Sequence, residues 1–146
     1  MIIDSHCHLS DERLKERIGE IVENFEDEGI EGVVEVGFDL PSSKNAVKLS
    51  EKYKNVFAVV GTHPHDAKDY DKASEDFYKS AAKFDKVIAI GEIGLDYYYD
   101  LSLREVQKDV FASQLDLAYE VGLPVVLHIR EAYKDALDIL TAKKDK

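Results

Sequence analysis

Short apolar runs alternate with longer segments of helical periodicity along this chain. The apolar runs are rich in β-branched residues and have the length of strands, at residues 2–3, 32–37, 56–61, 87–92 and 124–128. Most are continuously apolar, which is typical of strands that helices cover on both faces. Strands and helices that alternate in this way predict βαβ units and a parallel sheet.

The segments between the apolar runs carry hydrophobic residues at helical spacing. The predicted helices lie within residues 10–29, 42–53, 74–84 and 102–122, and a last one follows Arg130. A serine is placed to begin each of the first four, at Ser10, at Ser42 or Ser43, at Ser74 and at Ser102. Gly29 and Gly122 are placed to end the first and the fourth.

Five consecutive strand-helix units are therefore expected in one domain over residues 1–146. A chain of 146 residues with 45% hydrophobic residues can build one substantial core and no second one of similar size. Because βαβ crossovers are right-handed, five such units either begin a barrel or form a doubly wound sheet.

All five histidines lie at or just beyond the end of a predicted strand, at His6, His8, His63, His65 and His128. In parallel α/β folds the carboxyl ends of the strands border the binding crevice. Histidines that are distant in the sequence are therefore expected to converge in space.

His6 and His8 are separated by one residue, so a strand points both imidazoles to the same side and Cys7 to the other. This arrangement can chelate one cation. The alternative is a pair of histidines that are satisfied by hydrogen bonds at a strand end. Asp4 either orients one of the imidazoles or has a role in the strand end alone.

Glu92 lies at the end of an apolar strand, where burial of a lone carboxylate is costly. It needs a metal or a cationic side chain as a partner, and the nearby imidazoles favour a metal. The same reasoning applies to His128. Imidazole and carboxylate ligands accept zinc, manganese, cobalt or magnesium, so the identity of the divalent cation is not predicted.

His63, His65, Asp96 and Arg130 are the candidates for substrate contact. His63 and His65 can bind a phosphate or donate a proton, whereas a solvated loop position is the alternative for His65. Asp96 precedes three tyrosines at positions 97–99, which either stack on exposed bases or pack beneath a loop. Arg130 can bind a phosphate or pair with a neighbouring acid, Asp96 or Glu131.

Charge and hydropathy narrow the possible functions. Lys and Arg number 19 against 30 Asp and Glu, a net charge of -11, so a general basic surface for nucleic acid is absent. No apolar run approaches the about 18 residues that cross a bilayer, and the first residues lack a signal sequence, so we expect a cytoplasmic protein without membrane partners. Glycine-rich nucleotide loops, a serine-hydrolase elbow and paired cysteines are also absent.

Four segments, in this order along the chain, resemble the TatD-type metal-dependent deoxyribonucleases: DSHCH at 4–8, GTHPH at 61–65, AIGEIGLDY at 89–97 and LHIR at 127–130. The resemblance implies a TIM barrel of the amidohydrolase type. It also implies that His6, His8 and Glu92 ligate one divalent ion, that Glu92 bridges to a second ion held partly by His128, and that His63 faces the substrate.

The length departs from the family pattern. Family members continue into a sixth strand that ends in a metal-binding histidine and an eighth that ends in an aspartate ligand, and a complete barrel takes about 250 residues. We therefore expect an α/β fold that is an open, partial parallel (β/α) barrel of about five units. Its exposed edge would be covered by self-association or by a partner chain.

Three functional hypotheses follow. The first is a metal-dependent nuclease that uses one or two divalent cations, with Glu92 as the catalytic residue, to hydrolyse DNA, or RNA, at its ends. The second is a truncated or split non-catalytic member that binds metal or completes its barrel with a partner chain. The third keeps the metal and acts on a small amide or lactone.

Overall fold

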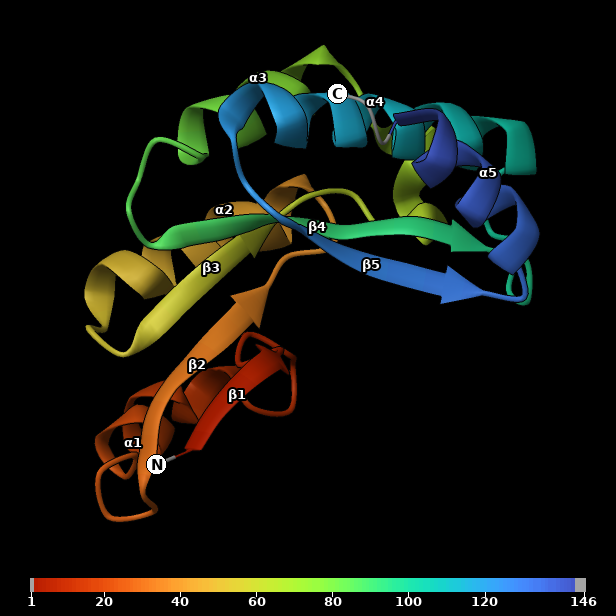
Figure 1. The fold of residues 1–146 in the computed structure, drawn as a ribbon. Helices are drawn as coiled ribbons and strands as arrows, with labels where there is room; N and C mark the ends of the chain where they lie inside the picture. Colours follow the sequence, from red (N-terminus) through yellow and green to blue (C-terminus); the bar gives the residue numbers. More distant parts are fainter. Residues whose placement is uncertain (1, 144–146) are drawn as a thin grey trace.

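The computed structural model describes residues 2–143, which form one curled sheet of five parallel strands with helices on its outer side (Figure 1). The strands are hydrogen-bonded in sequence order, β1-β2-β3-β4-β5, and every pairing is parallel. Their bounds are β1 (Ile2–Cys7), β2 (Ile30–Val36), β3 (Val56–Val60), β4 (Val87–Asp96) and β5 (Val125–Arg130).

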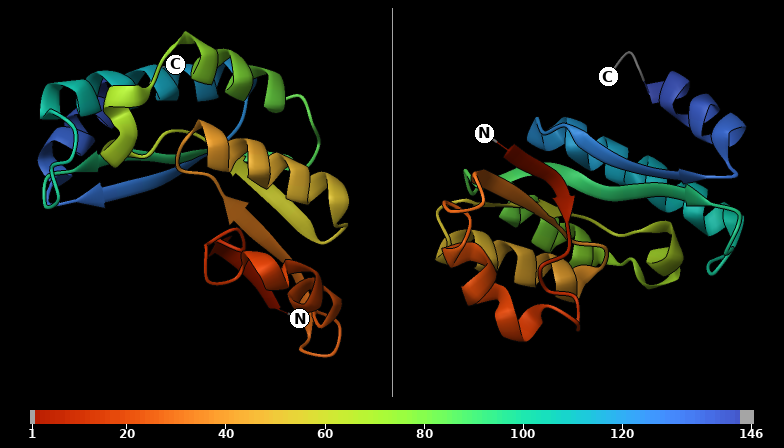
Figure 2. Two further views of the ribbon diagram at one scale, coloured as in Figure 1. Left: turned by 180° about the vertical axis from the view of Figure 1, so that it is seen from behind. Right: turned by 90° about the horizontal axis from the view of Figure 1, so that it is seen from below.

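Helices follow each strand and lie on the convex side of the sheet, as the two views in Figure 2 show. The α-helices are α1 (Ile18–Glu23), α2 (Leu40–Lys52), α3 (Lys72–Ala81), α4 (Arg104–Val121) and α5 (Tyr133–Lys143). Two short 3-10 helices, η1 (Lys15–Arg17) and η2 (Pro64–Asp69), precede α1 and α3. The prediction of five strand-helix units is confirmed.

The order of the strands distinguishes a partial barrel from a doubly wound sheet. Consecutive units add in one direction around the curve, which is how a TIM barrel is built. Among the described residues β1 and β5 each pair on one side only, and the concave face between them is open (Figure 1). Ile2 and Ile3 on the edge strand β1 are 56% and 64% exposed. The predicted open barrel is confirmed.

Apolar clusters fill both sides of the sheet. The largest cluster joins the strands to α2, α3, α4 and α5 and includes the fully buried residues Tyr78, Ile90 and Phe111. A smaller one consists of residues of β2, β3, β4 and β5 alone, such as Val34, Val59 and Ala89, and therefore occupies the concave face. Both faces of the central strands are buried, as their continuously apolar sequences predict.

Several helix starts differ from the predicted serines. Aspartates cap α2 and α3 instead, because the side chains of Asp39 and Asp71 accept from the amides of Ser42 and Ser74, three residues later in each case. Ser10 does not cap a helix either; its hydroxyl donates to a buried glutamate. Helix α4 begins without a side-chain cap, and its predicted end at the left-handed Gly122 is confirmed.

Strand β4 is longer than predicted and carries the chain from Glu92 to Asp96 in extended form. Gly94 makes this extension possible, since its φ is +145° and a Cβ there would clash with the carbonyl oxygen of His128 in β5. The close approach keeps β4 and β5 paired along the rim, with Gly94 opposite His128. Within residues 2–143, no helix is both long and apolar enough to span a membrane.

Candidate metal site

The five histidines converge at the rim of the sheet where the strands end, as predicted. Two sets of three side chains each offer ligand atoms that lie within 4.8 Å of one another. We call His6, His8 and Glu92 the His6 group, and His63, His65 and His128 the His63 group. The geometry thus provides two adjacent positions for a divalent cation.

The His6 group is built on the edge strand β1. His6 and His8 lie on the same side of the chain, with ring centroids 5.2 Å apart, while Cys7 packs into the cluster around Phe25 on the other side. Nδ1 of His8 lies 2.9 Å from the carbonyl oxygen of Val36, so Nδ1 carries the hydrogen and Nε2 keeps its lone pair. An imidazole held in this way is prepared to ligate a metal.

Two neighbours of these histidines have supporting roles. Asp4 accepts from the backbone amide of His6 at 3.0 Å, so it stabilises the backbone of the strand end and does not orient an imidazole. Burial, together with the charges of Glu35 and Asp4, raises the pKa of Cys7 to about 12. The thiol of Cys7 donates to the carbonyl oxygen of Val34 at 3.3 Å, on the side of β1 away from the imidazoles, so Cys7 is not part of the His6 group.

Glu92, a member of the His6 group, also faces the His63 group. Its Oε2 is 3.5 Å from Nε2 of His6, and its Oε1 is 3.2 Å from Nδ1 of His128. Burial opposes ionisation of Glu92, but the hydrogen bond with His128 and the charges of the neighbouring histidines outweigh it and lower the pKa of Glu92. The carboxylate is therefore the charged form, with one oxygen toward each group.

His63 is buried and differs from His8 in its tautomer. Its Nδ1 accepts from the backbone amide of His65 at 3.1 Å, which leaves the hydrogen on Nε2. Burial, with the charges of His128 and His65, lowers the pKa of His63 to about 4. At neutral pH His63 is thus an uncharged hydrogen-bond donor through Nε2, a state that suits a substrate oxygen better than a metal.

Asp96 holds two of the imidazoles in place. Its Oδ2 lies 2.9 Å from Nε2 of both His65 and His128, and its Oδ1 accepts from the amides of Tyr98 and Tyr99. Burial opposes ionisation, yet these hydrogen bonds lower the pKa of Asp96 to about 2. Asp96 is 0% exposed and both its oxygens accept hydrogen bonds inside the protein, and its predicted contact with substrate stays a prediction.

Arg130 takes neither of the acidic partners that the sequence suggested. Its guanidinium lies 4.1 Å from the ring centroid of Tyr98 and 4.8 Å from that of Tyr99. The hydroxyl of the third tyrosine, Tyr97, donates to Asp135 at 2.7 Å, and its ring is half-buried. One tyrosine therefore packs inside the loop, and two remain exposed beside Arg130.

Glu35 was not predicted as a site residue, although it is 1% exposed near the end of β2. Its carboxyl group accepts from the amides of Leu9 and Ser10, at 2.5 and 3.1 Å, and from the hydroxyl of Ser10. These bonds hold the segment that follows His8. A carboxyl group within an apolar run was the available signal, since the same argument identified Glu92.

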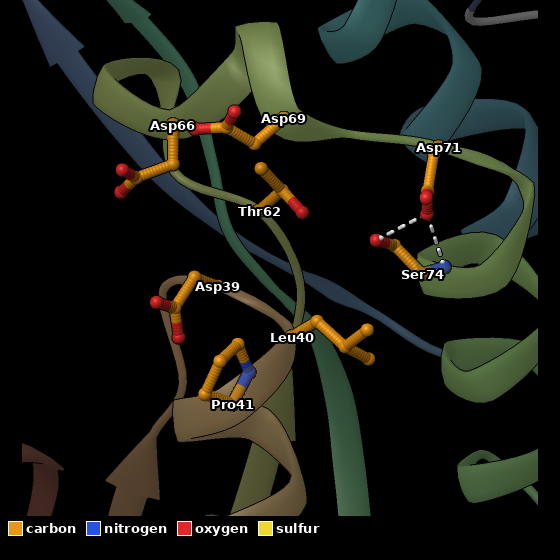
Figure 3. Close-up of a pocket in the computed structure, with 8 residues that line it drawn as sticks. All are labelled: Asp39, Leu40, Pro41, Thr62, Asp66, Asp69, Asp71 and Ser74. Atoms are coloured by element: carbon orange, nitrogen blue, oxygen red, sulfur yellow. Dashed lines mark hydrogen bonds between the residues drawn. The ribbon is translucent and has the colours of Figure 1, made fainter.

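Three pockets lie near this rim. One, of about 300 Å³, is lined by residues of both groups and by neighbouring loop residues: His8, Phe38, His63, His65, Asp66 and Glu92. A second, of about 270 Å³, is lined by aspartates and by the starts of α2 and α3 (Figure 3), and two of those aspartates, Asp39 and Asp71, cap helices. A third, of about 360 Å³, contains His8 but no ligand of the His63 group, so the first of these three pockets is the one that joins the two groups.

Comparison of the sequence with known proteins agrees with this geometry. The sequence profile of the family described as TatD related DNase matches residues 3–146. The chain is 40% identical over 140 residues to the uncharacterized metal-dependent hydrolase YabD of Bacillus subtilis (strain 168), a match that covers 96% of this chain and 55% of the relative. It is 34% identical over 120 residues to the 3'-5' ssDNA/RNA exonuclease TatD of Escherichia coli (strain K12), which covers 82% of this chain and 46% of that protein. The chain spans about half the length of the curated relatives that it matches.

Solved structures share the fold. The TatD homolog YjjV from Escherichia coli K12 superposes with a TM-score of 0.89 and 26% identity, over 97% of this chain and 56% of that one. An amidohydrolase from Saccharomyces cerevisiae gives a TM-score of 0.81 over 94% of this chain and 50% of its own, and at 21% identity it supports the fold alone.

Proposed function

The chain belongs to the TatD related DNase family, and on that premise we propose that it is a metal-dependent phosphodiesterase that acts at the ends of nucleic-acid strands. The observation that carries the proposal is the position of Glu92, which directs one oxygen toward His6 and the other toward His128. A carboxylate between two sets of imidazoles is the arrangement expected of a bridging ligand for two divalent cations.

In this proposal His6, His8 and Glu92 hold one cation, and Glu92 and His128 hold a second. The donor set fits, because Nε2 of His8 keeps its lone pair and Glu92 is ionised. When bound, the cations supply Lewis acidity toward a phosphoryl oxygen and lower the pKa of an attacking water. The identity of the metal is open among zinc, manganese, cobalt and magnesium.

The protein's own groups then position the substrate. The Nε2 hydrogen of His63 is available to a phosphoryl oxygen, and the low pKa of His63 keeps this donor uncharged at neutral pH. Asp96 accepts from Nε2 of His65 and of His128, and Nδ1 of His128 donates to Glu92. A cation held by Glu92 and His128 would take the place of that Nδ1 proton.

Nucleic-acid ends are the proposed substrate for two reasons. The relative from Escherichia coli carries the name of a single-strand exonuclease, and a cleft at the end of barrel strands admits a chain end more readily than an intact duplex. The net charge of -11 also requires local positive charge at the site, which bound cations would provide.

The test joins metal analysis to a hydrolysis assay on the 146-residue chain. We expect a single-stranded oligonucleotide to be shortened in the presence of added Mn²⁺, and both metal binding and hydrolysis to be lost when His6→Ala and Glu92→Ala are combined. Glu31→Gln, an exposed position on β2, is the matched control. Hydrolysis that survives the double substitution would contradict the proposal, and turnover of a small amide or lactone in its place would change the substrate class.

A second proposal concerns the open edges of the sheet. The chain covers 55% of the relative from Bacillus subtilis, and β1 and β5 each pair on one side only among the described strands. We propose that further strand-helix units pack against these edges, complete the barrel and add ligands. If so, a polypeptide that carries the corresponding half of a relative should raise metal affinity and hydrolysis when it is mixed with this chain, and light scattering should detect a one-to-one complex. A monomer that is fully active alone would exclude this proposal.

A further inference from the structure

Two exposed tyrosines and an arginine form a surface next to the histidines that the metal site does not use. Tyr98 and Tyr99 are 54% and 52% exposed, and their rings meet edge to face with centroids 4.8 Å apart. The exposed Arg130 lies against both rings. Exposed aromatic side chains that gather in one patch mark a candidate binding surface.

This surface is held firmly to the candidate site. The amides of Tyr98 and Tyr99 donate to Oδ1 of Asp96 at 3.0 and 2.8 Å, and Oδ2 of the same carboxylate binds His65 and His128. One buried carboxylate thus fixes the backbone of the tyrosines and the orientation of two imidazoles. The distance from the aromatic surface to the histidines is therefore set by Asp96.

The surface also adjoins the pocket directly. The ring centroid of Tyr99 lies 5.3 Å from that of His65, and His65 lines the pocket that contains Glu92. A nucleotide whose phosphate lies in the pocket carries its base only a few ångströms from that phosphate. The neighbouring base can therefore reach the tyrosines without rearrangement of the loop.

We propose that Tyr98, Tyr99 and Arg130 form a nucleobase subsite, in which an unpaired base stacks on a tyrosine ring and Arg130 neutralises the adjoining backbone phosphate. This inference rests on the proposed function, since it places the scissile phosphate at the histidines. Every base has a π-face, so stacking tolerates sequence but requires a base that has left the duplex. Arginine beside the rings adds the positive charge that the acidic chain otherwise lacks.

The experiment measures binding of two nuclease-resistant phosphorothioate oligothymidylates by fluorescence anisotropy with Mn²⁺. One has normal 3' nucleotides, and the other has abasic sugars at its last two positions. We expect the protein to bind the base-bearing strand about tenfold more tightly, as stacking of one base requires. The variant Tyr98→Leu/Tyr99→Leu should bind both strands equally, whereas Tyr98→Phe/Tyr99→Phe should keep the preference because the rings remain.

Further variants separate the roles. Arg130→Gln should weaken the binding of both strands alike, because a phosphate contact is common to both. The number of ions released on binding, measured from the salt dependence of the affinity, should fall by about one. Tyr119→Leu, an exposed tyrosine on α4, should change neither. The inference is overturned if the wild-type protein binds the two strands equally or binds neither, or if the leucine variant keeps the preference.

The failure of this subsite and the failure of the proposed function give different results. Hydrolysis of methyl 4-nitrophenyl phosphate, a diester without a nucleobase, is measured on the wild-type protein. Hydrolysis of this diester without a preference for the base-bearing strand would contradict the subsite and support the phosphodiesterase. A preference for the base-bearing strand without any hydrolysis would support the subsite and contradict the enzymatic proposal.

Discussion

The His6 group and the His63 group lie side by side but are supported in opposite ways. His6 lies in β1 and His8 directly after it, and β1 is an edge strand that is mostly exposed and is held to the molecule by β2 on one side. His63 follows the central strand β3, and His128 lies in β5 at the opposite edge, but hydrogen bonds with the backbone of His65 and with the buried Asp96 hold their imidazoles inside the protein. The His6 group depends on an exposed strand, whereas the His63 group depends on a buried carboxylate.

The difference shows how one barrel rim can provide two kinds of site. The buried group has its tautomers and orientations determined by fixed partners, as a positioned donor requires. The His6 group has fewer such partners, and in a closed barrel the strand on the other side of β1 would add further restraints. Glu92 directs one carboxylate oxygen to His6 and the other to His128, so it couples the two groups.

The largest effect is expected from a change that separates β4 from β5 under the His63 group. Gly94→Ala places a Cβ against the carbonyl oxygen of His128 at a φ of +145°. We expect the free energy of unfolding to fall by more than about 3 kcal/mol, from strain and overpacking together. Urea denaturation followed by circular dichroism measures this change.

Gly29→Ala is the matched control, because Gly29 also has a positive φ, of +70°, but has no atom within 4 Å of the added Cβ. It should cost only about 1 kcal/mol, from the backbone conformation alone. Equal losses in the two variants would show that close packing of β4 on β5 is not what requires glycine at position 94.

The next effect tests Asp96 as the support of the His63 group. The side-chain amide in Asp96→Asn has one acceptor oxygen and no charge. The two imidazoles therefore lose the charged oxygen that they share. We expect Mn²⁺ affinity and the rate of hydrolysis to fall by about 10–100-fold, as for other residues that orient metal ligands. Nuclear magnetic resonance titration should also show a lower pKa of His128, which Glu92 and Asp96 together raise.

Asp100→Asn is the control for this change, since Asp100 is exposed and pairs with Arg104 four residues later. It should alter neither affinity nor the pKa of His128. If Asp96→Asn lowers stability while the metal affinity and the pKa of His128 stay the same, the role of Asp96 is structural only.

The sequence predicted the strands and the convergence of the histidines because both follow from local patterns. An apolar run shows where a strand lies, and parallel topology then brings the strand ends together. The helix starts were predicted less well. Aspartate and serine are equivalent caps, so a sequence with Asp39 and Ser42 three residues apart does not show which one begins the helix.

The contacts that fix the imidazoles could not be predicted, because they join residues that are distant in the sequence. Nothing near His8 indicates that Nδ1 will meet the carbonyl group of Val36, 28 residues later. The burial of Asp96 depends on β4 running four residues beyond Glu92, and this in turn depends on Gly94 approaching β5. The candidate ligands could be predicted from local sequence, whereas the tautomers and orientations of the imidazoles depend on tertiary contacts.

Glu35 offers the corresponding test of the His6 group. Glu35→Gln removes a buried carboxyl group that accepts from Leu9 and Ser10, and Gln can replace only part of these bonds. We expect a loss of about 2 kcal/mol in unfolding free energy and lower Mn²⁺ affinity, because the segment after His8 is released. Glu31→Gln on the same strand is exposed and should stay within about 0.5 kcal/mol of the wild-type stability.

The smallest effect concerns acid. The pKa of Asp96 is about 2 in the folded protein and near 3.8 in the unfolded chain, so this carboxylate stabilises the fold above pH 3.8 and loses that contribution as the pH falls toward 2. By pH 3 the loss should be about 1 kcal/mol. Urea midpoints at pH 3 and pH 6 for the wild-type protein and Asp96→Asn measure it, because the variant lacks this titration and should lose less stability on acidification. Equal losses of stability on acidification in the two proteins would show that Asp96 does not carry the acid-labile contact.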